Sequence, residues 1–165
     1  MKFAIIAWAC ALAAACTTAP DATAPAMTKV YVTRHFQKAV GADPDLTAEG
    51  RANAARLADI LQGEGIRAIF VTATKRSEQS GRPLAERLGL ALTVYDPMDP
   101  ATLEAKVRAS GGSVLVVGHS NTVPDLVERF GGGRQQPMAE DQFGTLFVID
   151  QPSGALSRIE IRAPR

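Results

Sequence analysis

The sequence predicts an α/β fold, a three-layer α/β/α sandwich with a mostly parallel central sheet and a C-terminal antiparallel hairpin. Short apolar runs alternate with segments of helical periodicity, and this order repeats four times before a glycine-rich stretch at 131–144. The run at 114–117 is apolar throughout, which is typical of a parallel strand covered on both faces. Beyond the glycine-rich stretch, two more strand patterns flank a turn at 151–154, which indicates the hairpin.

The predicted strands are rich in β-branched and apolar residues and lie at 29–33, 68–71, 91–95, 114–117 and 146–149. A last strand at the sheet edge is expected to place Ile159 and Ile161 on one face and charged residues on the other. Gly81 and Pro83 are expected to weaken or kink the second helix. Residues that favour helix ends frame four helices: Thr47 and Gly63, the stop at Gly89, Asp99 with Pro100, and Asn121 or Thr122 with Gly131.

Length and composition indicate one globular domain. The chain has 165 residues, of which 46% are hydrophobic and 21% charged, which is enough for one core and too little for two. The formal net charge of +1, scattered arginines and few aromatic residues argue against a nucleic-acid-binding protein. We expect the folded domain to occupy 29–165 as a monomer.

The first sixteen residues have the pattern of a secretory signal peptide, with Lys2 followed by an apolar run and small residues. The sequence 12–16 resembles a lipobox, which would make Cys16 a lipidation site, and 17–28 is expected to be a flexible linker. Ordinary cleavage near Ala15 is the alternative, and would leave a soluble periplasmic protein. Cys10 and Cys16 both precede the domain, so it contains neither a disulfide nor a thiolate metal site.

Four chemically active residues follow predicted strands: Arg34 and His35 after the first, Arg76 after the second, and His119 after the fourth. The carboxyl ends of parallel strands meet at one edge of a sheet, where ligands bind. Two guanidiniums and two imidazoles without an obvious neighbouring carboxylate favour an anion, and the arginine fork matches phosphate oxygens. A neutral histidine nitrogen can also attack phosphorus and carry the phosphoryl group covalently.

These residues resemble the motifs of the histidine phosphatase (phosphoglycerate mutase-like) superfamily, small bacterial members included. The resemblance extends from Val30 to about Arg162. Its motifs in this sequence are Thr33-Arg34-His35, the segment 43–50, the segment 72–80 with Arg76, and Gly118-His119-Ser120-Asn121-Thr122.

The resemblance implies a role for each site residue. His35 becomes the phosphohistidine, Arg34 and Arg76 hold the phosphate, and His119 donates to it in the transition state. No cofactor or metal is implied. The proton donor to the leaving group is the variable part of the family, and Asp96 is our candidate because Asp99 is needed as a helix cap.

The sequence departs from the family pattern at two positions. Phe36 replaces the usual small residue and is expected to crowd the pocket mouth, and Gln37 stands where relatives often have an acid. The short connection before Pro100 leaves no room for a large lid, so we expect an open site and hydrolase rather than mutase activity. The predicted protein is a periplasmic phosphomonoester hydrolase acting on a phosphorylated small molecule or protein side chain.

Two other classes of protein remain as alternatives. A non-catalytic, anion-binding lipoprotein with a degenerate site would retain the phosphate pocket without turnover. A metalloenzyme is less favoured, since two histidines and no cysteine in the domain give few strong ligands. Glu140 and Asp141 could reach the site from the long loop, although surface solubility explains them equally well.

Overall fold

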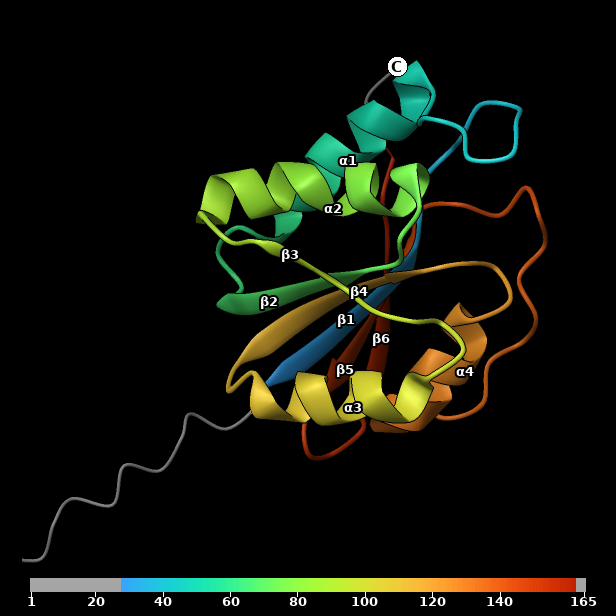
Figure 1. Ribbon diagram of the computed structural model, residues 1–165. Coiled ribbons are helices and arrows are strands. Elements are labelled where there is room, and N and C mark those ends of the chain that lie inside the picture. Colours follow the sequence, from blue (N-terminus) through green and yellow to red (C-terminus); the bar gives the residue numbers. More distant parts are fainter. Residues whose placement is uncertain (1–27, 163–165) are drawn as a thin grey trace, which may run out of the picture.

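The computed structural model describes residues 28–162, and six strands within them form one sheet in the order β3-β2-β4-β1-β5-β6 (Figure 1). Strands β1 to β4 are parallel, whereas β5 runs antiparallel to β1 and β6 antiparallel to β5. This is the predicted mostly parallel sheet with a terminal antiparallel hairpin. The strands are β1 Lys29–Arg34, β2 Ile66–Val71, β3 Leu92–Val94, β4 Ser113–Gly118, β5 Thr145–Asp150 and β6 Leu156–Glu160.

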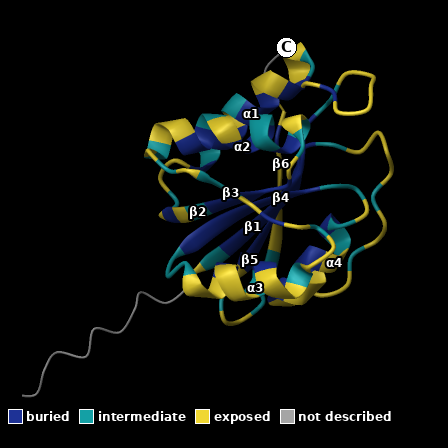
Figure 2. Cartoon of the chain, viewed as in Figure 1, coloured by how far each residue is buried: buried dark blue, intermediate teal, exposed yellow. Residues whose placement is uncertain are grey.

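Helices cover both faces of the sheet and give the three predicted layers (Figure 1). The helices are α1 Ala48–Leu61, α2 Lys75–Leu88, α3 Pro100–Ala109, α4 Val123–Val127 and the π-helical turn η1 Glu128–Gly132. One buried apolar cluster joins α1 and α2 to the sheet, and a second joins α3 and α4 to its other face. Figure 2 shows the central strands buried between helices whose outer surfaces are exposed.

The predicted helix caps are found where their chemistry places them. The Thr47 hydroxyl accepts from the amide of Gly50, and Asp99 accepts from the amide of Thr102, both at 3.1 Å. Gly89 ends α2 in the left-handed region, with φ of 65°. The fourth helix differs: the Thr122 hydroxyl makes no capping bond, because it accepts from the amide of His119 instead.

Two expectations about packing change. Helix α2 runs from Lys75 to Leu88 without interruption although it contains Pro83. Gly81 lets it approach the sheet, since a Cβ there would lie 3.1–3.3 Å from side chains of β2 and β3. At the sheet edge, the two isoleucines expected on one face differ in burial, since Ile161 is buried whereas Ile159 in the edge strand β6 is 38% exposed.

The predicted signal peptide, the lipidation site Cys16 and the linker up to residue 27 lie outside the described residues. Within 28–162, no helix combines the length and the apolar character that a membrane span requires.

Candidate active site

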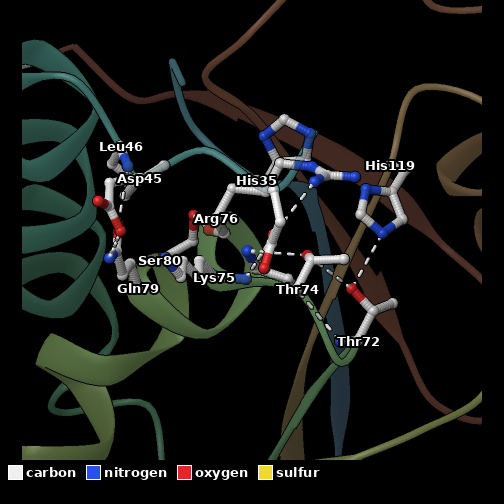
Figure 3. A network of polar contacts seen from close by, with 12 residues as sticks. His35, Asp45, Leu46, Thr72, Thr74, Lys75, Arg76, Gln79, Ser80 and His119 are labelled. Carbon is white, nitrogen blue, oxygen red and sulfur yellow. Dashed lines mark hydrogen bonds and ion pairs between the residues drawn. The ribbon is translucent and has the colours of Figure 1, made fainter. Parts of the chain in front are cut away.

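The register of three neighbouring strands brings the predicted site residues to one edge of the sheet. Arg34 pairs with Gly118 across β1 and β4, and Val71 pairs with Val117 across β2 and β4. The next residues along the chain are therefore His35, Thr72 and His119, side by side in space. The amide of His35 also donates to the carbonyl of Gly118 at 3.0 Å, which fixes the start of the loop. Figure 3 shows Arg76 extending from the start of α2 toward the two histidines.

His35 is buried and is held in one tautomer. It is 2% exposed, and its Nδ1 lies 2.8 Å from the carbonyl oxygen of Phe36. A carbonyl only accepts, so Nδ1 carries the proton and Nε2 of the neutral ring has a free lone pair. Burial, together with the charges of the neighbouring cationic groups, lowers the pKa of His35 to about 4. The ring is therefore neutral at pH 7, as a nucleophile must be.

His119 faces His35 and is oriented by a threonine. The two rings lie 5.3 Å apart between centroids at an interplanar angle of 64°. Nε2 of His119 is 2.9 Å from the hydroxyl of Thr72, which follows β2 (Figure 3). Burial and then the charges of Arg76 and Arg34 lower the pKa of His119 to about 4. His119 is therefore a neutral hydrogen-bonding group rather than a third cation at pH 7.

The long loop before β5 holds Arg34 on several sides. Nη1 donates to the carbonyl oxygens of Ala139 at 2.9 Å and Gln142 at 3.0 Å, and Nη2 lies 3.2 Å from Oε2 of Glu140. The guanidinium carbon is also 4.2 Å from the centroid of the Phe143 ring, a cation–π contact. Burial lowers the pKa of Arg34, and the Glu140 carboxylate opposes that effect.

Arg76 reaches the site from the first turn of α2 and is held much less tightly. Its Nη1 lies 3.6 Å from Oδ1 of Asp43, and its side chain is 19% exposed. The same carboxylate accepts from the amide of Lys75 at 3.0 Å, so Asp43 also caps the helix. Gln79 ties the loop to α2 through Asp45 and the amide of Leu46 (Figure 3).

The two arginines share a feature that points to an anion. Among the described residues, the buried side-chain polar atoms without a hydrogen-bond partner are Nε of Arg34 and Nε of Arg76. A buried donor left unpaired is costly, and a bound ligand is one way to satisfy it. Each Nε–H can bind one oxygen of a phosphate group, which matches the role predicted for both arginines.

The predicted acid Asp96 is exposed, and its side chain accepts a hydrogen bond at 2.8 Å from the amide of Met98 in its own loop. Glu140 does contact a site residue, Arg34, and its other oxygen accepts from the Ser120 hydroxyl at 2.7 Å. Glu140 at Arg34 and Asp43 at Arg76 also correct the expectation of a site without compensating carboxylates. Asp96 as the proton donor stays a prediction.

The two departures from the family pattern are structural. Phe36 is fully buried in the apolar cluster beneath α1 and α2, so the prediction that it crowds the pocket mouth was wrong. Its amide donates to the Ser80 hydroxyl at 3.0 Å. Gln37 joins the loop to α1 through Glu49 and Asn53. The expected open site is also not observed at His35, which is 2% exposed and has the Phe143 ring of the loop before β5 at 5.9 Å from its own ring.

Sequence reasoning missed the groups that hold the site residues in place. Thr72 orients His119, Phe143 contacts Arg34 with its ring centroid 5.9 Å from that of His35, and Ser80 links the Phe36 amide to the carbonyl of Arg76. Thr72 could have been found, because it follows a predicted strand as His35 and His119 do. Phe143 gives no local signal. Within 28–162, no group of three or more histidine, cysteine or carboxylate side chains is arranged to hold a metal ion.

The fold and these side chains define a class of protein, an α/β domain with a histidine and an oxyanion-binding arginine pair at the carboxyl edge of its sheet. The model of the histidine phosphatase superfamily (branch 1) matches residues 30–99, which include both arginines and His35. No curated protein matches the chain at a significant level.

Solved structures of phosphatases share the fold. A protein histidine phosphatase SixA complexed with tungstate is 24% identical at a TM-score of 0.62, covering 82% of this chain and 97% of that one. A mycobacterial glucosyl-3-phosphoglycerate phosphatase is 15% identical at 0.62, covering 83% and 99%. An alpha-ribazole phosphatase from Shigella flexneri is 13% identical at 0.61, covering 81% and 96%.

The family model thus matches the part of the chain that carries Arg34, His35 and Arg76, and this match together with the shared fold of these neighbours supports the assignment of the chain as a phosphatase of the histidine phosphatase type. The family match ends before His119, whose place beside His35 comes from the structure.

Proposed function

We propose that this protein is a metal-independent phosphomonoester hydrolase of the cell envelope that acts through a phosphohistidine on His35. One observation carries the proposal: the two unpaired buried Nε donors belong to arginines whose charges act on a neutral histidine with a free Nε2. The donors bind a phosphate group, and the free lone pair attacks it. A pocket that only bound anions would not require a neutral nucleophile in a fixed tautomer.

The phosphoryl transfer uses groups that are already in place. Nε2 of His35 attacks phosphorus while its Nδ1–H stays bonded to the Phe36 carbonyl, which stabilises the positive charge that develops on the ring. Arg34 and Arg76 neutralise the equatorial oxygens through charge-assisted hydrogen bonds. Water then attacks the phosphohistidine and releases inorganic phosphate.

His119 supports the transferring group as a hydrogen-bond donor. When the Thr72 hydroxyl donates to Nε2 of His119, the proton of the neutral ring is on Nδ1. That N–H is then available to the phosphate on the side of His35. A donor fixed before the reaction stabilises charge that grows in the transition state without a cost of reorganisation.

The substrate is a phosphorylated small molecule or a phosphorylated protein side chain. Structural neighbours of both kinds support this range, since one is described as a protein histidine phosphatase and another as an alpha-ribazole phosphatase. The envelope location rests on the leader sequence and the lipobox at Cys16. Fractionation of cells that express the parent or Cys16→Ala tests this location. If Cys16 is lipidated, the parent is found in the membrane fraction and the variant is not.

The test of activity uses the protein with a generic aryl phosphate in the presence of a metal chelator, beside His35→Ala. Turnover in the parent that is lost by at least about 10³-fold in the variant is the expected result, because the covalent route is removed. A folded parent that binds tungstate or vanadate but releases no phosphate from a broad substrate panel contradicts the proposal. That outcome favours the non-catalytic anion-binding protein, although the burial of Phe36 removes one argument for that alternative.

A further inference from the structure

Glu140 contacts both halves of the catalytic motif at once. Its Oε2 lies 3.2 Å from Nη2 of Arg34, the residue before the nucleophile, and its Oε1 accepts at 2.7 Å from Ser120, the residue after His119. The backbone on either side is fixed too, because the carbonyls of Ala139 and Gln142 accept from Nη1 of Arg34. The position of this carboxylate is therefore set by the site, although its side chain is 83% exposed.

The free donors of Arg34 place a bound phosphate next to Glu140. Nη1 is occupied by two carbonyls, which uses both of its hydrogens. The donors that remain are the unpaired Nε–H and the second hydrogen of Nη2. A phosphate that binds them shares Nη2 with the Glu140 carboxylate, so their oxygen atoms lie close to each other.

A cavity of about 560 Å³ is lined in part by Ser120, the hydrogen-bond partner of Glu140. Its wall also includes Asn121. The rest of the wall includes two prolines and the polar residues Asp125, Glu128, Arg134 and Gln136. The cavity gives room for a polar leaving group, and the Ser120 hydroxyl connects its wall to the Glu140 carboxylate.

We propose that Glu140 is the general acid and base of the reaction, and that the leaving group occupies the cavity beside Ser120. This inference rests on the proposed hydrolase activity and adds the residue that protonates the departing alcohol. It is an alternative to the position expected from the sequence, Asp96, whose side chain bonds to its own loop.

The proton that Glu140 gives in the first step is regained in the second step. In the first, Nε2 of His35 forms a bond to phosphorus, the bond from phosphorus to the ester oxygen breaks, and the Glu140 carboxyl gives its proton to that oxygen. In the second, the Glu140 carboxylate takes a proton from the attacking water while the bond from nitrogen to phosphorus breaks. Hydrogen phosphate leaves, and both His35 and the protonated Glu140 are restored.

The charge around Glu140 changes when substrate binds, in the direction that an acid needs. In the free protein the hydrogen bond from Ser120 and then the charge of Arg34 lower the pKa of Glu140, so it is ionised. A phosphate dianion beside Glu140 adds a like charge and competes with Glu140 for the guanidinium of Arg34. Both changes raise the pKa of the carboxyl and favour its protonated form. Substrate binding thus recruits the proton that the leaving group receives.

The test compares two esters whose leaving groups differ in their need for a proton. Nitrophenolate leaves without protonation, whereas an alkoxide does not. In Glu140→Gln, which keeps the shape and an oxygen for Ser120, we expect kcat/KM for an alkyl phosphate to fall by about 10²–10⁴-fold. For nitrophenyl phosphate we expect it to change less than about threefold. Asp141→Asn is the matched control, because it removes a neighbouring exposed carboxylate that has no hydrogen bond or ion pair within 28–162, and both esters should react as with the parent.

Dependence on the leaving group separates this role from a purely structural one. If Glu140 only holds Arg34 in place, Glu140→Gln lowers kcat/KM for both esters by the same factor, and the inference is overturned. It is also overturned if neither ester changes, or if the selective loss appears in Asp96→Asn instead. A folded parent that turns over neither ester and forms no phosphoenzyme overturns the proposed hydrolase activity itself. That result differs from an active parent whose kcat/KM values do not change in Glu140→Gln.

Discussion

Arg34 and Arg76 have the same free donor at the site, but the chain holds them in different ways. Arg34 is 1% exposed, donates to two loop carbonyls and a carboxylate, and lies against the ring of Phe143. The Arg76 side chain, by contrast, forms an ion pair with Asp43 at 3.6 Å. Arg34 therefore joins phosphate binding to the structure of the loop before β5, whereas Arg76 serves mainly the ligand.

The difference also shows where the fold gives up stability for the site. A cation in the first turn of a helix is unfavourable against the helix dipole, and Arg76 occupies that position in α2 beside Lys75. A phosphate would reverse the sign of this interaction, since helix N-termini attract anions. Arg76 thus carries a small structural cost that a bound anion removes.

The largest expected effect is that of Arg34→Gln, which removes both functions of this side chain. We expect kcat/KM to fall by about 10³-fold or more, and the free energy of unfolding to fall by about 2 kcal/mol, because two loop carbonyls lose a charged donor. Steady-state kinetics and urea denaturation measure the two quantities. Unchanged stability would show that the loop does not depend on Arg34.

Arg76→Gln is expected to separate activity from stability. We expect kcat/KM to fall by about 10²-fold, while the free energy of unfolding changes by less than about 1 kcal/mol, because the lost ion pair is partly exposed. Arg82→Gln is the control on the same helix, since its ion pair with Glu78 is also exposed. A loss of stability in Arg76→Gln as large as that in Arg34→Gln would remove the distinction between the two arginines.

The smallest expected effect is on the pH dependence of stability, which tests the neutral state of His35 and His119. Their native pKa values of about 4 lie below the ordinary 6.5, so the unfolded chain takes up protons over this range and the native state does not. The contribution of the two neutral histidines to the free energy of unfolding is fully present above pH 6.5 and declines as the pH falls toward 4. In phosphate-free buffer, His35→Gln and His119→Gln should each flatten this part of the curve. A parent curve no steeper than that of either variant would contradict the buried, neutral state.

The sequence was sufficient to predict the sheet, its parallel core and the convergence of the histidines, because these depend on local patterns. An apolar run followed by Arg34 and His35 identifies a strand end, and parallel strands bring such ends together. Thr47 and Asp99 could be recognised as caps for the same reason, since a helix start depends on neighbours within four residues.

The rest of the site depends on contacts between distant parts of the chain. Glu140 lies 106 residues from Arg34, and no periodicity or spacing relates the two. Phe36 was misjudged for a similar reason: whether a residue after a strand faces the pocket or the core depends on the backbone of the loop, which here turns its ring beneath α1 and α2. The loop before β5 supplies these distant contacts, since its carbonyls bind Arg34 and its Phe143 lies near His35.

The most direct test of the account is to trap the phosphoenzyme. The protein is mixed with a phosphate-labelled ester, quenched in base within milliseconds, and digested for mass spectrometry. We predict a phosphoryl group on His35 that is stable in base and labile in acid, and that is absent from His35→Ala. Turnover without a labelled protein, or a label on His119, would contradict the assignment of His35 as the nucleophile.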